Sequence, residues 1–282
     1  MSPGTRLILQ YLILAEPLVT IGALLAWIRA GQRGHGMPAM RDYLVVRFVN
    51  TTINIALLAF WVRVHAGPGS WQQTLYLYEY WIGFFVQAWF MLRVAEAVLQ
   101  QFLGPLPGLR TLAKTVFRWV LAAAMLLALP AGIALAIVFV SRSGRLAVLF
   151  RFLATISIAE LIPIASVMVV GLYVGCRTGG RAFAILSALS LEPLTTLATS
   201  WFQVRGVLVW TNLILEIVGY IALGLWTWYA FHPDREEQRR TPNATLQHWD
   251  LLARKALRHR LPAVEEPEIV PQGGRPWPRP ND

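Results

Sequence analysis

Apolar residues fill long stretches of this chain, without the wide polar face that a helix on the surface of a soluble core shows. A helix needs roughly 20 predominantly apolar residues to cross about 30 Å of hydrocarbon. Stretches of that length lie near residues 8–28, 43–63, 77–100, 115–140, 147–173, 183–203 and 207–231. The pattern predicts an all-α integral membrane protein, a bundle of seven transmembrane helices in contact with the lipid bilayer.

Basic side chains predict the orientation of this bundle. The loops after spans one, three and five, together with the tail, carry sixteen Lys and Arg residues, whereas the opposite side carries four, Arg142 and Arg145 among them. Because positive loops stay in the cytoplasm, we expect the N-terminus outside and the C-terminus inside. The first stretch contains Glu16 and lacks a small-residue cleavage site, so we expect it to be a retained span rather than a signal peptide.

The segment after the last span, residues 232–282, is a basic cytoplasmic tail. Within residues 243–261, one helical face gathers Leu246, Trp249, Leu252, Ala253, Ala256 and Leu257. Basic residues flank that face, which predicts a helix lying on an anionic cytoplasmic leaflet. The alternative is a helix that docks a cytoplasmic protein partner. Residues 262–282 contain six prolines and few apolar residues, which predicts disorder.

Composition excludes several functions. The net charge of +10 lies in loops and the tail, which is a topology signal and not one for nucleic acid. No histidine lies inside a span and no lysine lies deep in one, so neither an intramembrane histidine metal site nor a retinal Schiff base is expected. Motifs of nucleophilic and zinc hydrolases are absent from the sequence. We expect no metal and no cofactor, and we expect a role other than that of a nucleophilic or metal-dependent enzyme.

Only two of the 25 basic residues are lysines, a composition typical of a high-GC bacterial genome. The sequence therefore predicts a bacterial inner-membrane protein.

The most informative polar residues are carboxylates inside the predicted spans. Six of the seven acidic residues before Phe231 lie there, and a carboxylate in hydrocarbon costs several kcal/mol unless it is paired, protonated or hydrated. Four of them lie deep, namely Glu16, Glu160, Glu192 and Glu216. Since Arg47 and Arg93 are the only arginines deep in the spans, ion pairing cannot satisfy all of these carboxylates. They are candidates for binding a proton, an ion or a substrate.

Prolines accompany three of these four glutamates. Pro17 follows Glu16, Pro193 follows Glu192, and a third proline comes three residues after Glu160. A proline cannot donate to the carbonyl four residues earlier, so each span gains a free carbonyl within a turn of a carboxylate. Oxygen-rich breaks of this kind hold sodium ions or protons in several transporters. The alternative is an ordinary kink whose carbonyl a nearby Ser or Thr satisfies.

Polar stripes at helical spacing extend this set. Asn50 follows Arg47 on span two, and Asn212 precedes Glu216 on span seven, so both asparagines are candidate binding residues. Hydrogen bonds that hold the helices together are the alternative for such stripes.

Arg93 and Glu96 lie three residues apart on span three, and Arg47 lies in the same half of span two. We expect these three residues to form one internal ion cluster, either a structural bridge or a gate.

Two functions remain open. The first is a permease for a small solute, or an ion-coupled carrier, that uses the deep carboxylates; we favour it because those residues lie inside the bundle. The second is a seven-helix sensor that docks a cytoplasmic partner through its tail. A lipid-modifying enzyme with an acid–base pair of carboxylates is a third hypothesis.

Overall fold

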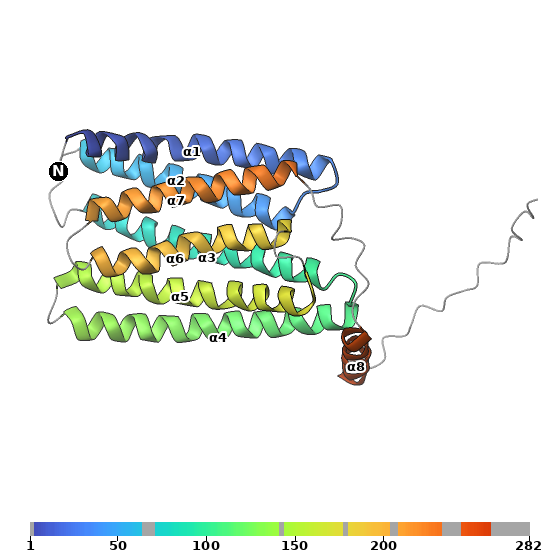
Figure 1. Cartoon of the computed structure of the whole chain (residues 1–282). Coiled ribbons are helices and arrows are strands. Elements are labelled where there is room, and N and C mark those ends of the chain that lie inside the picture. The colour runs from blue at the N-terminus through green and yellow to red at the C-terminus, as the bar shows by residue number, and fades with distance from the viewer. Residues whose placement is uncertain are drawn as a thin grey trace, which may run out of the picture.

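The structure is a computed structural model that describes residues 3–63, 71–140, 144–176, 180–203, 208–232 and 244–260. Within these ranges the chain is helical and contains no strand (Figure 1). The helices are α1 (Pro3–Gln32), α2 (Pro38–Arg63), α3 (Trp71–Phe102), α4 (Pro107–Val140), α5 (Gly144–Tyr173), α6 (Arg181–Gln203), α7 (Leu208–Phe231) and α8 (Ala244–Arg260).

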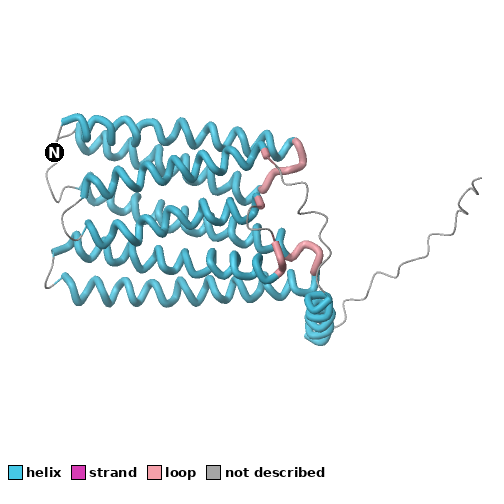
Figure 2. Tube along the Cα trace, in the orientation of Figure 1, coloured by secondary structure: helices cyan, strands magenta, loops and turns pink. Residues whose placement is uncertain are grey.

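Glycines end two of the long helices. Gly34 follows α1 with a φ of 77°, and Gly175 follows α5 with a φ of 80°. In both turns the N–H of the next residue donates to the carbonyl five residues back, at 2.9 Å. This is the Schellman arrangement, whose left-handed position only glycine adopts without strain. The described turns lie together at one end of the bundle, near α8 (Figure 2).

Seven of the helices run side by side, alternating in direction (Figure 1). Contacts between neighbours close a ring in the order α1, α2, α3, α5, α6, α7 and back to α1. Helix α4 packs outside this ring against α5 and α3. The ring brings α1 and α2 together with α6 and α7 round a common interior, although the two pairs are far apart in the sequence.

Large side chains fill the described core toward the end of the bundle where these turns lie. Trp27, Tyr43, Leu92, Leu186 and Trp226 come from five different helices, and each is at most 1% exposed. Many apolar side chains on the outer faces are instead exposed, as expected for helices in contact with lipid.

Six helices of the described residues are long and apolar enough to cross a membrane. They are Leu7–Gln32, Pro38–Phe60, Ile82–Phe102, Ala154–Tyr173, Arg181–Ser200 and Asn212–Phe231. This supports a multi-pass helical membrane protein. Most side chains of α4 beyond residue 123 are outside the described part, so the count of seven spans stays a prediction, as does the orientation. The predicted disorder of residues 262–282 also falls outside the described residues.

Helix α8 docks on the first turn of α4. Leu246, Asp250 and Ala253 are buried on one side of α8, whereas Trp249 and Leu252 are exposed. The apolar residues that were expected on one face of this helix are thus divided between two faces of α8. The reason is that Asp250, which belongs to the buried side, has a partner on α4.

That partner is the N-terminus of α4. Asp250 Oδ1 accepts a hydrogen bond from the backbone N–H of Leu109 at 3.0 Å, and Arg254 donates to Oδ2 at 2.8 Å. The first turn of a helix has N–H groups without intrahelical partners, and the residue before Pro107 is a leucine, which cannot cap them. Gly108 permits the approach, because a Cβ there would lie 2.6 Å from the Asp250 carbonyl oxygen.

Burial alone would raise the pKa of Asp250, but hydrogen bonds from the Leu109 N–H and from Arg254 outweigh it, so this pKa lies below its usual range. A lowered pKa in the folded protein means that the ionised carboxylate stabilises docking at neutral pH. This contribution is lost as the pH falls through the pKa of the docked Asp250.

We expect Asp250→Ala to weaken the docking of α8 on α4, because the loss of a helix cap lowers stability by about 1 kcal/mol. Hydrogen exchange of residues 244–260 at neutral pH is then expected to rise about fivefold. Asp42→Ala is the matched control, because in the described part of the chain this carboxylate pairs with its exposed neighbour Arg41. Unchanged exchange in the Asp250 variant would contradict the capping role.

Candidate functional site

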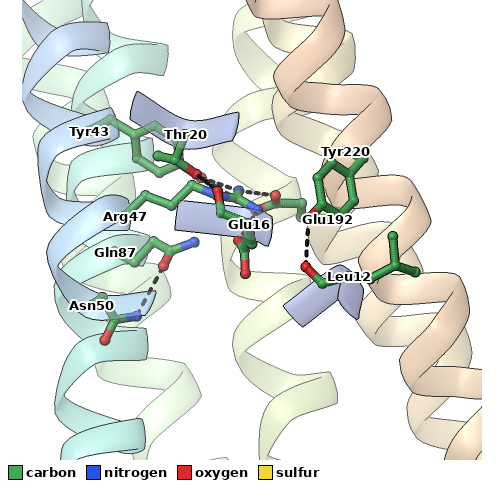
Figure 3. A network of polar contacts seen from close by, with 9 residues as sticks. All are labelled: Leu12, Glu16, Thr20, Tyr43, Arg47, Asn50, Gln87, Glu192 and Tyr220. Carbon is green, nitrogen blue, oxygen red and sulfur yellow. Dashed lines mark hydrogen bonds and ion pairs between the residues drawn. The ribbon is translucent and has the colours of Figure 1, made fainter. Parts of the chain in front are cut away.

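An arginine inside the bundle pairs with carboxylates from two other helices (Figure 3). Arg47 Nη2 of α2 lies 2.8 Å from Glu16 Oε1 of α1, and Nη1 forms an ion pair with Glu192 of α6. Arg47 is only 5% exposed. A buried guanidinium requires such partners, since an unpaired charge in the membrane is costly. We call Glu16, Arg47 and Glu192 the central ion triad.

Tyr43 fixes the triad from one turn earlier on α2. Its hydroxyl accepts a hydrogen bond from Arg47 Nη1 and donates one to Glu192 Oε2, both at 3.3 Å. The Tyr43 ring packs edge-on against Trp226 of α7, with 5.5 Å between the ring centroids. Because both rings are fully buried, the phenol holds Arg47 and Glu192 in one arrangement.

A cavity of about 160 Å³ adjoins the triad, and we call it the triad cavity. Beside the triad, its lining consists of Thr196 of α6 and of Leu215, Glu216, Gly219 and Tyr220 of α7. The Tyr220 hydroxyl donates to the Leu12 carbonyl at 2.6 Å, which joins α7 to α1 (Figure 3). Among the described residues, Glu216 has no ion-pair partner. The triad cavity therefore presents three carboxylates and a single guanidinium.

Gly219 lets the backbone of α7 approach the guanidinium. A Cβ at this position would lie 3.1 Å from Arg47 Nη2 and 3.8 Å from Glu192 Oε1. A larger side chain would therefore occupy the triad cavity or displace Arg47.

A second cavity of about 70 Å³ lies between α3, α5 and α6, and we call it the Glu160 cavity. Its polar lining consists of Gln87, Glu160, Glu192 and Thr196. Glu192 and Thr196 also line the triad cavity, so they form the wall between the two. The four deep glutamates thus surround two adjacent cavities.

The two candidate asparagines lie elsewhere. Asn50 donates to Gln87 Oε1 at 3.2 Å and packs against Gly83, where an added Cβ would overlap its side chain. It lines a groove between α2 and α3 that is mostly apolar. Asn212 is exposed on α7. Neither asparagine lines the triad cavity or the Glu160 cavity, and a binding role for either stays a prediction.

The structure separates Arg47 from the Arg93–Glu96 pair, contrary to the expected single cluster. Arg93 Nε lies 3.9 Å from Glu96, and Arg118 of α4 approaches the same carboxylate at 3.5 Å. The side chains of Arg93 and Arg118 are more than half exposed, whereas that of Arg47 is 6% exposed. Arg47 turns instead toward α1 and α6, because Tyr43 and Glu192 hold it there.

Sequence reasoning missed Tyr43, Gln87 and Gly219 as parts of the site. Tyr43 precedes Arg47 by four residues and Gly219 follows Glu216 by three, so helical spacing was the signal available for both. Gln87 gives no such signal, because it approaches Glu160 only through the packing of α3 on α5.

The described residues contain no group of three or more His, Cys, Asp or Glu side chains placed to hold a metal ion. No known protein family, curated protein or solved structure matches the chain. The fold and site define a class: a multi-pass helical protein with polar, acid-rich cavities among its apolar helices.

This arrangement can bind positive charge and exchange protons. Carboxylates outnumber guanidinium groups around the triad cavity. The side chains that line this cavity come from four different helices. A ligand bound there would contact α1, α6 and α7 together. A change in any one of these charges would alter the forces that hold the helices together.

Proposed function

We propose that the protein is a permease that carries a small, positively charged solute through the bundle, with Glu16, Glu192 and Glu216 as binding residues. The observation that carries this proposal is the triad cavity, where carboxylates of three helices face one guanidinium. A cationic solute would supply the missing positive charge. Its entry would also weaken the hold of Arg47 on Glu192 and so allow the helices to shift.

A purely structural role for the triad is the competing explanation. Ion pairs between helices need no cavity beside them, and they need no further carboxylate. Here Glu216 lines the cavity without an ion pair in the described part of the chain. That surplus supports binding over a role in packing alone.

Uptake by proteoliposomes tests the permease. We expect at least one member of a panel of radiolabelled small organic cations to enter proteoliposomes faster than it enters protein-free liposomes. Glu192→Gln and Glu216→Gln are expected to reduce this uptake roughly 10- to 100-fold, since each removes a charged contact. Glu79→Gln is the matched control, because Glu79 lines neither polar cavity. If no panel member is taken up, or if all glutamine variants transport normally, the permease proposal fails.

A second candidate is a membrane sensor whose tail reads the cytoplasmic leaflet, and α8 supports it. Trp249 and Leu252 are exposed on α8 beside the basic Lys255, while Asp250 holds the helix on α4. This surface suits anionic lipid. If the difference in fluorescence between the wild type and Trp249→Phe were equal in vesicles with and without anionic lipid, this candidate would lose its support.

A further inference from the structure

We propose that the Glu160 cavity binds an alkali metal cation, with Glu160 as its principal ligand. Glu160 is 5% exposed in α5 and lines the cavity. No hydrogen bond or ion pair joins it to another described residue, although almost every buried carboxylate has such a partner. A cation in the cavity would supply that partner.

Other oxygen atoms surround the same space. Glu192 and Thr196 of α6 contribute a carboxylate and a hydroxyl, and Gln87 of α3 contributes an amide. Asn50 donates to Gln87 Oε1, which fixes the orientation of that amide and leaves its oxygen a second lone pair. Carboxylate, amide and hydroxyl oxygens are the ligands that hard cations prefer.

The size and charge of the cavity favour a monovalent ion. The cavity has a volume of about 70 Å³, whereas one molecule of liquid water occupies about 30 Å³. This volume leaves little room for an organic molecule. Of its two carboxylates, Glu192 is already paired with Arg47. Glu160 has no counter-charge among the described residues, and one monovalent cation would balance its charge.

The shared wall gives this ion a role, which rests on the proposed transport function. Glu192 and Thr196 line both cavities, so a cation beside Glu160 would compete with Arg47 for Glu192. A cation in the Glu160 cavity would thereby change the charge that the triad cavity presents to the solute. The cation would then be the coupling ion of the carrier.

The binding itself is measured without transport. Thermal unfolding of the purified full chain is followed at constant ionic strength, and at each of several pH values, in N-methyl-D-glucamine, lithium, sodium or potassium chloride. We expect at least one alkali cation, at ten times its Kd, to raise the Tm of the wild type by about 3 °C over N-methyl-D-glucamine. In Glu160→Gln and in Thr196→Val this shift is expected to vanish, and in Glu79→Gln to persist.

Each outcome decides between alternatives. Equal Tm values in all four salts, with a Tm that moves only with pH, would assign Glu160 to a proton and overturn the cation site. A cation shift that survives in both Glu160→Gln and Thr196→Val would place the ion elsewhere and overturn it as well. A shift lost in those variants, in a protein that takes up no solute, would uphold the cation site and reject the permease.

Discussion

Replacing Arg47 with methionine is expected to destabilise the bundle by about 3–5 kcal/mol, because it leaves Glu16 and Glu192 without their counter-charge inside the protein. Methionine retains much of the length of the arginine stem, so the loss reports on charge rather than on volume. Thermal or denaturant unfolding in detergent measures it. Arg93→Met is the control, since the Arg93 side chain is more than half exposed and its Nε lies 3.9 Å from Glu96, so its removal is expected to cost much less stability.

A compensating variant separates charge from packing. If the destabilisation comes from unpaired carboxylates, then adding Glu16→Gln and Glu192→Gln to Arg47→Met is expected to recover most of the lost stability. A triple variant as unstable as Arg47→Met alone would show that the arginine stem, and not its charge, holds α1 and α6. Equal effects of Arg47→Met and Arg93→Met would contradict the buried triad altogether.

Filling the triad cavity from α7 is expected to abolish solute uptake without removing any charge. Gly219→Val places methyl groups where even a Cβ would approach Arg47 Nη2 to 3.1 Å. Displacing a binding group by as little as 1 Å can cost roughly 100-fold in activity, so we expect uptake to fall at least tenfold. The same proteoliposome assay measures the effect.

Gly224→Val is the matched control on the same helix. A Cβ at Gly224 would meet no atom within 4 Å, and the residue is exposed, so valine there is expected to leave uptake close to that of the wild type. If both valine variants lose uptake equally, the defect comes from α7 as a helix and not from the cavity. Normal uptake by Gly219→Val would exclude the triad cavity from the route.

Hydrophobic patterning predicted where the helices lie, because the length of an apolar stretch is a local property. It also identified the glutamates, since a carboxylate in such a stretch is conspicuous. It did not predict which of them meet Arg47. The partners of Arg47 are 31 and 145 residues away in the sequence, and helical spacing shows which face a residue occupies but not which helix lies opposite.

The tail shows the same limit of prediction from sequence spacing. The apolar spacing of residues 243–261 predicted an amphipathic helix, and a helix occupies Ala244–Arg260. The pattern treated Asp250 as an ordinary polar position, whereas its carboxylate is buried on α4. That contact depends on Gly108 and on a cap that α4 lacks locally, so only the packed structure reveals it.

The docking of α8 also affects how the orientation of the protein is measured. Reporter enzymes are commonly fused to shortened chains, and Phe231, where α7 ends, is the obvious junction. A chain cut there loses Asp250, so its reporter would follow a protein in which the first turn of α4 lacks its cap. Fusions placed after Arg260 retain this contact, and they are the ones from which the side of the membrane should be determined.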